Sequence, residues 1–189
     1  MRGTFIAPLI FGLAGMAILI ALGIWQVQRL AWKEGVLAEI EAQIAADPVS
    51  LPEAPDPEQH KYLPVEVKGN IGSRALRVLV SRKGSGAGYR VISALELDDR
   101  KILLDRGFVK VAEDIPPSPE GRVTVSGNLH WPDDRNASTP QNDVAGNTWF
   151  ARDLGPMAAE LGTEPLLLVA RRMSVSDAPV TPLPVDTGA

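Results

Sequence analysis

The longest apolar stretch of the chain lies at its N-terminal end. No charged side chain occurs between Arg2 and Arg29, and residues 5–24 consist mainly of Phe, Ile, Leu, Ala, Gly and Met. About 20 such residues, each rising about 1.5 Å, cover the roughly 30 Å hydrocarbon core of a bilayer. The pattern therefore predicts a membrane-spanning helix.

A cleaved signal peptide is the alternative interpretation, because Ala21 and Gly23 satisfy the small-x-small rule for a cleavage site. The apolar part of a signal peptide is usually about 7–15 residues long, so the length of this run favours a retained anchor. Basic residues flank both ends, Arg2 on one side and Arg29 and Lys33 on the other, which leaves the orientation open. No Arg-rich, Ser-rich transit peptide precedes the run, and this favours a bacterial inner membrane.

Apolar residues continue at helical spacing beyond the span, at Leu30, Leu37, Ile40 and Ile44. They predict that the transmembrane helix and its helical extension occupy residues 1–46. Pro48 disfavours a helical conformation at the residue before it, so the helix is expected to end there. Residues 47–60 hold four prolines and are predicted to form an extended, semi-rigid linker.

After residue 60 apolar and polar positions alternate, as is typical of β-strands. The alternation predicts paired strands at residues 63–67 and 76–80 around a turn at Gly72-Ser73, then strands at 89–97, 101–111, 122–130, 148–151 and 165–173. A short helix is predicted at residues 155–161, with Pro156 in its first turn and Gly162 at its end. Residues 61–173 are therefore expected to be a β-rich α+β domain whose mostly antiparallel sheet is barrel-like or packed in two layers.

The tail, residues 174–189, contains three prolines and little apolar periodicity. It is predicted to be a second extended linker.

Charge and composition exclude several classes of function. The formal net charge is -4 and every acidic residue lies beyond Leu30, so the soluble part is acidic and lacks the clustered basic face that nucleic acid requires. The chain has no cysteine, which excludes disulfides, thiolate metal sites and a cysteine nucleophile. No partner of the nucleic-acid class is expected.

The candidate binding residues gather at the end of the predicted span. Trp25 and Trp32 share one helical face with Arg29, and Gln26 and Lys33 lie beside them. One interpretation is an interface belt, since tryptophan prefers the headgroup level and basic side chains reach toward lipid phosphate. The other interpretation is a specific surface for a ligand or a partner helix.

Elsewhere the sequence offers little chemistry. His60 and His130 lack the apolar surroundings that a haem ligand needs, and no His, Asp or Glu cluster has metal-ligand spacing. The glycine-rich residues 84–88 lack the lysine of a phosphate loop and are interpreted as a hairpin loop. Arg106 and Gly107 are expected to serve a strand turn, and Trp149 to pack in the core. No acid, base and nucleophile set is present, so an enzyme is not expected.

Several short motifs, taken in order, resemble those of a known family. They are Gly23-x-Trp25-Gln26-x-x-Arg29-x-x-Trp32-Lys33, Tyr62-x-Pro64-Val65-x-Val67-x-Gly69, Gly88-Tyr89-x-Val91, Leu104-x-Arg106-Gly107-Phe108-Val109, Val125-x-Gly127, Pro140-x-Asn142-Asp143 and Asn147-x-Trp149-Phe150-x-x-Asp153. Together they resemble the surfeit-locus-one assembly factors of haem-copper cytochrome c oxidase, over nearly the whole chain.

The resemblance implies a domain on the outer side of the inner membrane, which is periplasmic in a bacterium or faces the intermembrane space in a mitochondrion, bracketed by two membrane helices. It also implies a role in delivering or holding haem a during assembly of the oxidase catalytic subunit, with that subunit, the haem a synthesis machinery and membrane lipid as partners. Haem a would bind transiently, and Trp25, Gln26, Arg29, Trp32 and Lys33 are the candidates for a haem or partner surface, because arginine grips carboxylates such as haem propionates.

The family's second membrane helix, with its candidate haem-ligating histidine, is expected after the tail, and the sequence stops at Ala189, before that element. No axial ligand can therefore be named. The alternatives to haem delivery are a scaffold that never binds haem and a stable accessory subunit of the oxidase.

Overall fold

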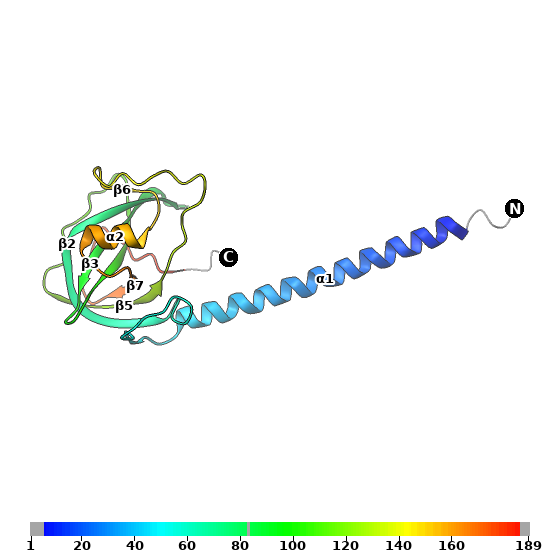
Figure 1. Ribbon diagram of the computed structural model, residues 1–189, viewed down its shortest axis with the longest axis horizontal. Coiled ribbons are helices and arrows are strands. Elements are labelled where there is room, and N and C mark those ends of the chain that lie inside the picture. The colour runs from blue at the N-terminus through cyan, green and yellow to red at the C-terminus, as the bar shows by residue number, and fades with distance from the viewer. Residues whose placement is uncertain (1–5, 83, 186–189) are drawn as a thin grey trace. The chain divides into compact units, whose positions relative to one another are not determined.

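The computed structural model describes residues 6–82 and 84–185 (Figure 1). The chain divides into two compact units, one up to Ala42 and one from Gln43 onward. Some predictions fall outside the described residues. These are the flanking charge of Arg2, residue 5 at the start of the predicted span, and the last four residues of the predicted tail.

The N-terminal helix is present and continuous. Helix α1 (Ile6–Ala45) contains 40 residues, and its candidate span, Pro8–Ala45, has an 18-residue window of mean hydropathy 2.2 with none of that window buried. At about 1.5 Å per residue the helix is about 60 Å long, about twice the hydrocarbon thickness. By length and composition it can cross a membrane and extend well beyond it.

The domain is built from a ring of strands, which confirms the predicted β-rich fold with a mostly antiparallel sheet. Its elements are β1 (Val49–Ser50), β2 (Pro64–Arg82), β3 (Gly86–Glu96), β4 (Lys101–Lys110), β5 (Arg122–His130), β6 (Thr148–Trp149), α2 (Leu154–Leu161) and β7 (Leu167–Met173). The neighbours run β2-β3-β4-β7-β5, and β5 pairs with β2 again, which closes the ring. Among the strands of the described residues, the β4–β7, β1–β2 and β2–β6 pairs are parallel and the others are antiparallel. Figure 1 shows α2 lying across the strands.

The predicted turn at Gly72-Ser73 is wrong. Strand β2 continues through both residues, and its first half pairs with β5 while its second half pairs with β3 and β6. The register with β3 shifts between Ile71 and Ala75, so the glycine marks an irregularity inside one long strand. Such a strand can serve two neighbours in succession, which is how a sheet of few strands closes.

The two larger apolar clusters of the domain lie on opposite faces of β4 and β7, and a smaller third cluster includes the tail residue Val180. Ile102 and Leu104 belong to the cluster that also holds Val65, Val125 and Leu129. Leu103, between them, points to the other cluster, which contains Trp149 and the α2 residue Met157. Strands buried on both faces read as continuous apolar runs. The predicted core position of Trp149 is confirmed, since its side chain is fully buried.

The tail is not a free linker, contrary to the sequence-based expectation. Asp177 and Val180 are buried, and Thr181 forms an antiparallel bridge with Phe108 of β4. A segment with three prolines and little apolar periodicity has the composition of a linker, but here individual side chains and backbone groups of the segment pack against the ring of strands. The described part of the tail is therefore a component of the domain.

The proline-rich residues 47–60 also contact the domain. Val49 and Ser50 form β1 beside β2, and the Arg100 side chain donates to the carbonyl of Glu53 at 2.8 Å. His60 Nδ1 accepts a hydrogen bond from the Asp56 N–H at 2.9 Å and so closes a turn. These contacts hold the segment against the ring rather than leaving it as a spacer.

Candidate functional sites on the helix and the domain

The five candidate residues of the sequence all lie on α1. The Arg29 guanidinium carbon sits 5.2 Å from the centre of the Trp25 ring, which is a cation–π contact. Four of the candidates, Trp25, Gln26, Arg29 and Lys33, line one shallow surface together with Leu30. Trp32 is 66% exposed and is not among the residues that line this surface, although it lies between Arg29 and Lys33 in the sequence. The helix alone therefore brings together an aromatic face and two cations.

Arg106 and Gly107 do not form a strand turn. They lie inside β4, where Val91 pairs with Gly107 and Ile92 with Asp105, so Arg106 is the extra residue of a β-bulge. The buried Arg106 guanidinium binds the Asp177 carboxylate, with Nε to Oδ2 at 2.8 Å and Nη2 to Oδ1 at 2.5 Å. The bulge thus lets Arg106 hold the tail.

Gly107 and Gly127 are required by close backbone approach. A Cβ on Gly107, whose φ is +129°, would lie 2.1 Å from the Thr181 carbonyl oxygen, and one on Gly127 would lie 2.2 Å from the Val169 carbonyl oxygen. The glycines of these two motifs therefore serve tail docking and strand pairing.

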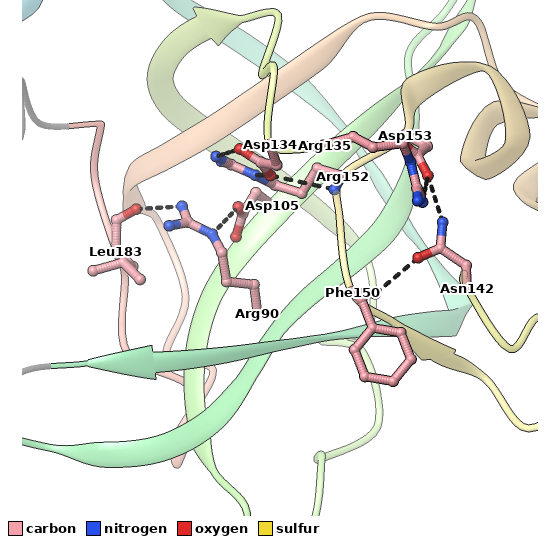
Figure 2. Close-up of polar contacts among 9 residues, drawn as sticks. All are labelled: Arg90, Asp105, Asp134, Arg135, Asn142, Phe150, Arg152, Asp153 and Leu183. Atoms are coloured by element: carbon pink, nitrogen blue, oxygen red, sulfur yellow. Dashed lines mark hydrogen bonds and ion pairs between the residues drawn. The ribbon is translucent and has the colours of Figure 1, made fainter. Parts of the chain in front are cut away.

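Asp105, next to the bulge, faces a second arginine. Its carboxylate accepts from Arg90 Nε at 2.5 Å and from the Gly107 N–H at 3.1 Å. Burial raises the pKa of the Asp105 carboxyl, and the positive charges of Arg90 and Arg152 oppose that rise. Figure 2 shows Arg90 between Asp105 and the carbonyl of Leu183, to which its Nη2 donates at 2.8 Å.

Two aspartate–arginine ion pairs hold the loop that follows β5. Arg152 binds both carboxylate oxygens of Asp134, at 2.6 and 2.9 Å. Arg135 binds both oxygens of Asp153, which also accepts from the Asn142 side-chain amide. Figure 2 shows these pairs together. Asn142 and Asp153 both occur in the sequence motifs, and these hydrogen bonds give each of them a structural role.

His130 lies beside this loop and is half-buried. Its ring stacks on Tyr62 with 5.5 Å between centroids. Burial, with a smaller contribution from the positive charge of Arg152, lowers the pKa of His130 to about 4. At neutral pH the ring is therefore uncharged.

The His130 shift predicts an acid-sensitive domain. The unfolded chain binds a proton near pH 6.5 and the folded ring only near pH 4, so stability is fully present above pH 6.5 and is lost as the pH falls toward 4. Allowing for solvent screening of a partly exposed ring, we expect a loss of about 1–2 kcal/mol. Urea unfolding followed by circular dichroism at pH 7 and pH 4.5 measures it. A His130→Gln variant should show a smaller loss, and an equal loss in both proteins would contradict the assignment.

In the part of the chain that is described, no group of three or more His, Asp or Glu side chains is placed to hold a metal ion. His60 serves a turn.

Comparison with known proteins identifies a family that covers most of the chain. The SURF1 family model matches residues 13–187. The chain belongs to the SURF1 family. Surfeit locus protein 1 of Homo sapiens is 33% identical over 177 residues, covering 81% of this chain and 59% of the human protein.

Further members are similarly distant. Surfeit locus protein 1 of Xenopus tropicalis is 32% identical over 180 residues, covering 82% of this chain and 58% of that protein. The SURF1-like protein of Monosiga brevicollis is 32% identical over 169 residues, covering 79% and 64%. The chain thus spans somewhat more than half the length of these relatives.

Sequence reasoning missed the residues that join distant segments. Arg90, Arg152 and the tail residue Leu183 were not singled out, and their proximity depends on the closed ring. An arginine inside an alternating strand, as Arg90 is, was the one available signal, because buried strand positions rarely carry unpaired charge.

Proposed function

We propose that this SURF1-family protein is a membrane-anchored assembly factor for haem-copper cytochrome c oxidase that assists delivery of haem a to the catalytic subunit. Its domain would stand in the periplasm of a bacterium, anchored in the inner membrane by α1, with the catalytic subunit and the haem a synthesis machinery as partners. The observation that carries the proposal is the family match over residues 13–187, which includes the aromatic and basic end of the helix.

The residues Trp25, Gln26, Arg29, Trp32 and Lys33 are the proposed haem or partner surface. A haem has an apolar ring and two carboxylates, so it suits a place where exposed indole faces adjoin cations at the headgroup level. The Arg29 guanidinium carbon lies 5.2 Å from the centre of the Trp25 ring, so its planar fork of N–H donors stands beside that indole. Those donors would bind a propionate bidentately.

Neither His60 nor His130 is expected to ligate the haem iron. His60 Nδ1 already accepts the Asp56 N–H, and His130 stacks on Tyr62 beside charged arginines instead of in an apolar haem-sized cavity. The residues of α1 would therefore suit the propionate end and the ring of haem a, and neither of the two histidines is proposed as its axial ligand.

Haem retention tests this surface. The full chain, purified in detergent after co-expression with a haem a synthesis system, should show a haem a Soret band, and Arg29→Ala with Trp32→Ala should reduce bound haem about tenfold, because a charge-assisted hydrogen bond and an aromatic contact are both lost. Val27→Ala, an exposed change elsewhere on α1, is the matched control and should retain haem. Retention at the wild-type level in the double variant would refute the proposed surface.

Two other functions would give different results. A scaffold for nascent subunits would bind the catalytic subunit but show no Soret band in any variant. A permanent accessory subunit would copurify with the mature, active oxidase in constant ratio, whereas an assembly factor would be recovered mainly with immature subunit. Pulse-labelled pull-down on the tagged chain separates these two outcomes.

A further inference from the structure

A pocket of about 260 Å³ opens where the ends of several segments meet. Three arginines line it from three parts of the chain: Arg82 at the end of β2, Arg90 in β3 and Arg152 in the loop after β6. His130, at the end of β5, and Leu183 and Val185 of the tail also line it. No acidic residue is among the described lining residues.

The aspartates that pair with two of these arginines lie outside the pocket lining. Arg90 uses Nε and Nη2 for Asp105 and Leu183, and Arg152 uses the same two nitrogens for Asp134. Within the described residues no hydrogen bond involves Nη1 of either arginine, and no ion pair involves Arg82. The pairs therefore orient two guanidiniums and leave an Nη1 donor group on each that is available to a ligand.

The remaining walls of the pocket are apolar or uncharged. Leu183 and Val185 contribute alkyl side chains, and His130 is neutral at physiological pH because burial lowers its pKa to about 4. Fixed cationic donors beside apolar walls suit a ligand that has an anionic group joined to an apolar group. The volume is below the range of about 300–1,000 Å³ typical of drug-sized ligands, so it suits an oxyanion and the first few carbons attached to it.

We propose that this pocket binds an oxyanion, a carboxylate or a phosphate, carried on an apolar group. The guanidiniums of Arg90 and Arg152 are held in place by their aspartates, so they lose little rotamer entropy when the anion binds. Arg82, on the exposed rim, adds a third cation. The site shares no residue with the surface on α1, and the proposal does not rest on haem delivery.

Side-chain NMR of the full chain in detergent tests the site. With arginine labelled in the guanidinium nitrogens, titration with butyrate or inorganic phosphate should shift the Arg90 and Arg152 resonances in a saturable manner. Butyramide, which matches butyrate in size but lacks the charge, should not. Arg82→Gln and Arg152→Gln should each raise the dissociation constant about tenfold, because each variant loses a charge-assisted contact with the anion.

Arg135→Gln is the matched control. Arg135 also binds an aspartate bidentately in the same loop but does not line the pocket, so this variant removes one positive charge without touching the site. It should bind the anions as wild type does. Saturable binding of either anion supports the site, and the tighter of the two identifies the ligand class as carboxylate or phosphate. No saturable shift, equal binding of butyramide, or equal weakening by Arg135→Gln would overturn the proposal, whatever the result of the haem experiment.

Discussion

Replacing Asp177 by asparagine is expected to destabilise the domain by about 3–5 kcal/mol, the usual cost of leaving a buried charge without its partner. The Arg106 and Asp177 side chains are 0% and 2% exposed and share two hydrogen bonds. Asparagine keeps the shape but removes the negative charge, so Arg106 would stay charged and unpaired inside the domain. Chemical unfolding of the detergent-purified chain, followed by circular dichroism, gives the change in free energy.

Two controls separate this ion pair from general charge loss. Asp153→Asn removes an aspartate from a bidentate pair at the surface and should cost far less, because water compensates the exposed partner. The double variant Arg106→Met/Asp177→Leu replaces both charges by apolar groups and should recover most of the stability. A double variant as unstable as Asp177→Asn would show that the loss comes from packing of the tail and not from unpaired charge.

Replacing Trp149 by alanine is expected to cost about 3–5 kcal/mol, as truncations of large buried aromatic residues do. Trp149 is fully buried against Leu76, Leu103 and Met157, from β2, β4 and α2. The cavity would open where α2 covers the ring, so helix and strands should loosen together. Thermal unfolding monitored at near-ultraviolet wavelengths reports the lost packing directly.

Two neighbouring changes calibrate that loss. Phe150→Ala alters the adjacent, half-buried ring and should destabilise less. Trp149→Phe fills most of the space, and it also removes an Nε1–H that has no partner within the described residues, so it should cost less than Trp149→Ala. Equal losses for Phe150→Ala and Trp149→Ala would contradict a core role for the tryptophan.

The strand prediction succeeded where local patterns decide the structure. Residues 122–130 were predicted as a strand and form β5 with those bounds, and the short helix has Gly162 in the left-handed conformation at its end. It failed at Gly72-Ser73, because glycine followed by serine has the composition of a turn and of a strand irregularity alike. Pairing of β2 with β5 and β3 in succession settles which one forms, and pairing is non-local.

The sequence by itself determined a helix long and apolar enough to cross a membrane, most strands, the short helix and the family, since each depends on composition, period or motif order along the chain. Only the tertiary structure decided what the tail does and where the arginines point. Arg106 meets Asp177 across 71 residues, and Arg90 meets Leu183 across 93. Such contacts depend on a β-bulge and on ring closure, which bring together segments whose local patterns carry no record of each other. The aromatic and basic residues of α1 needed no tertiary structure to be found, because one helix places them on a shared surface.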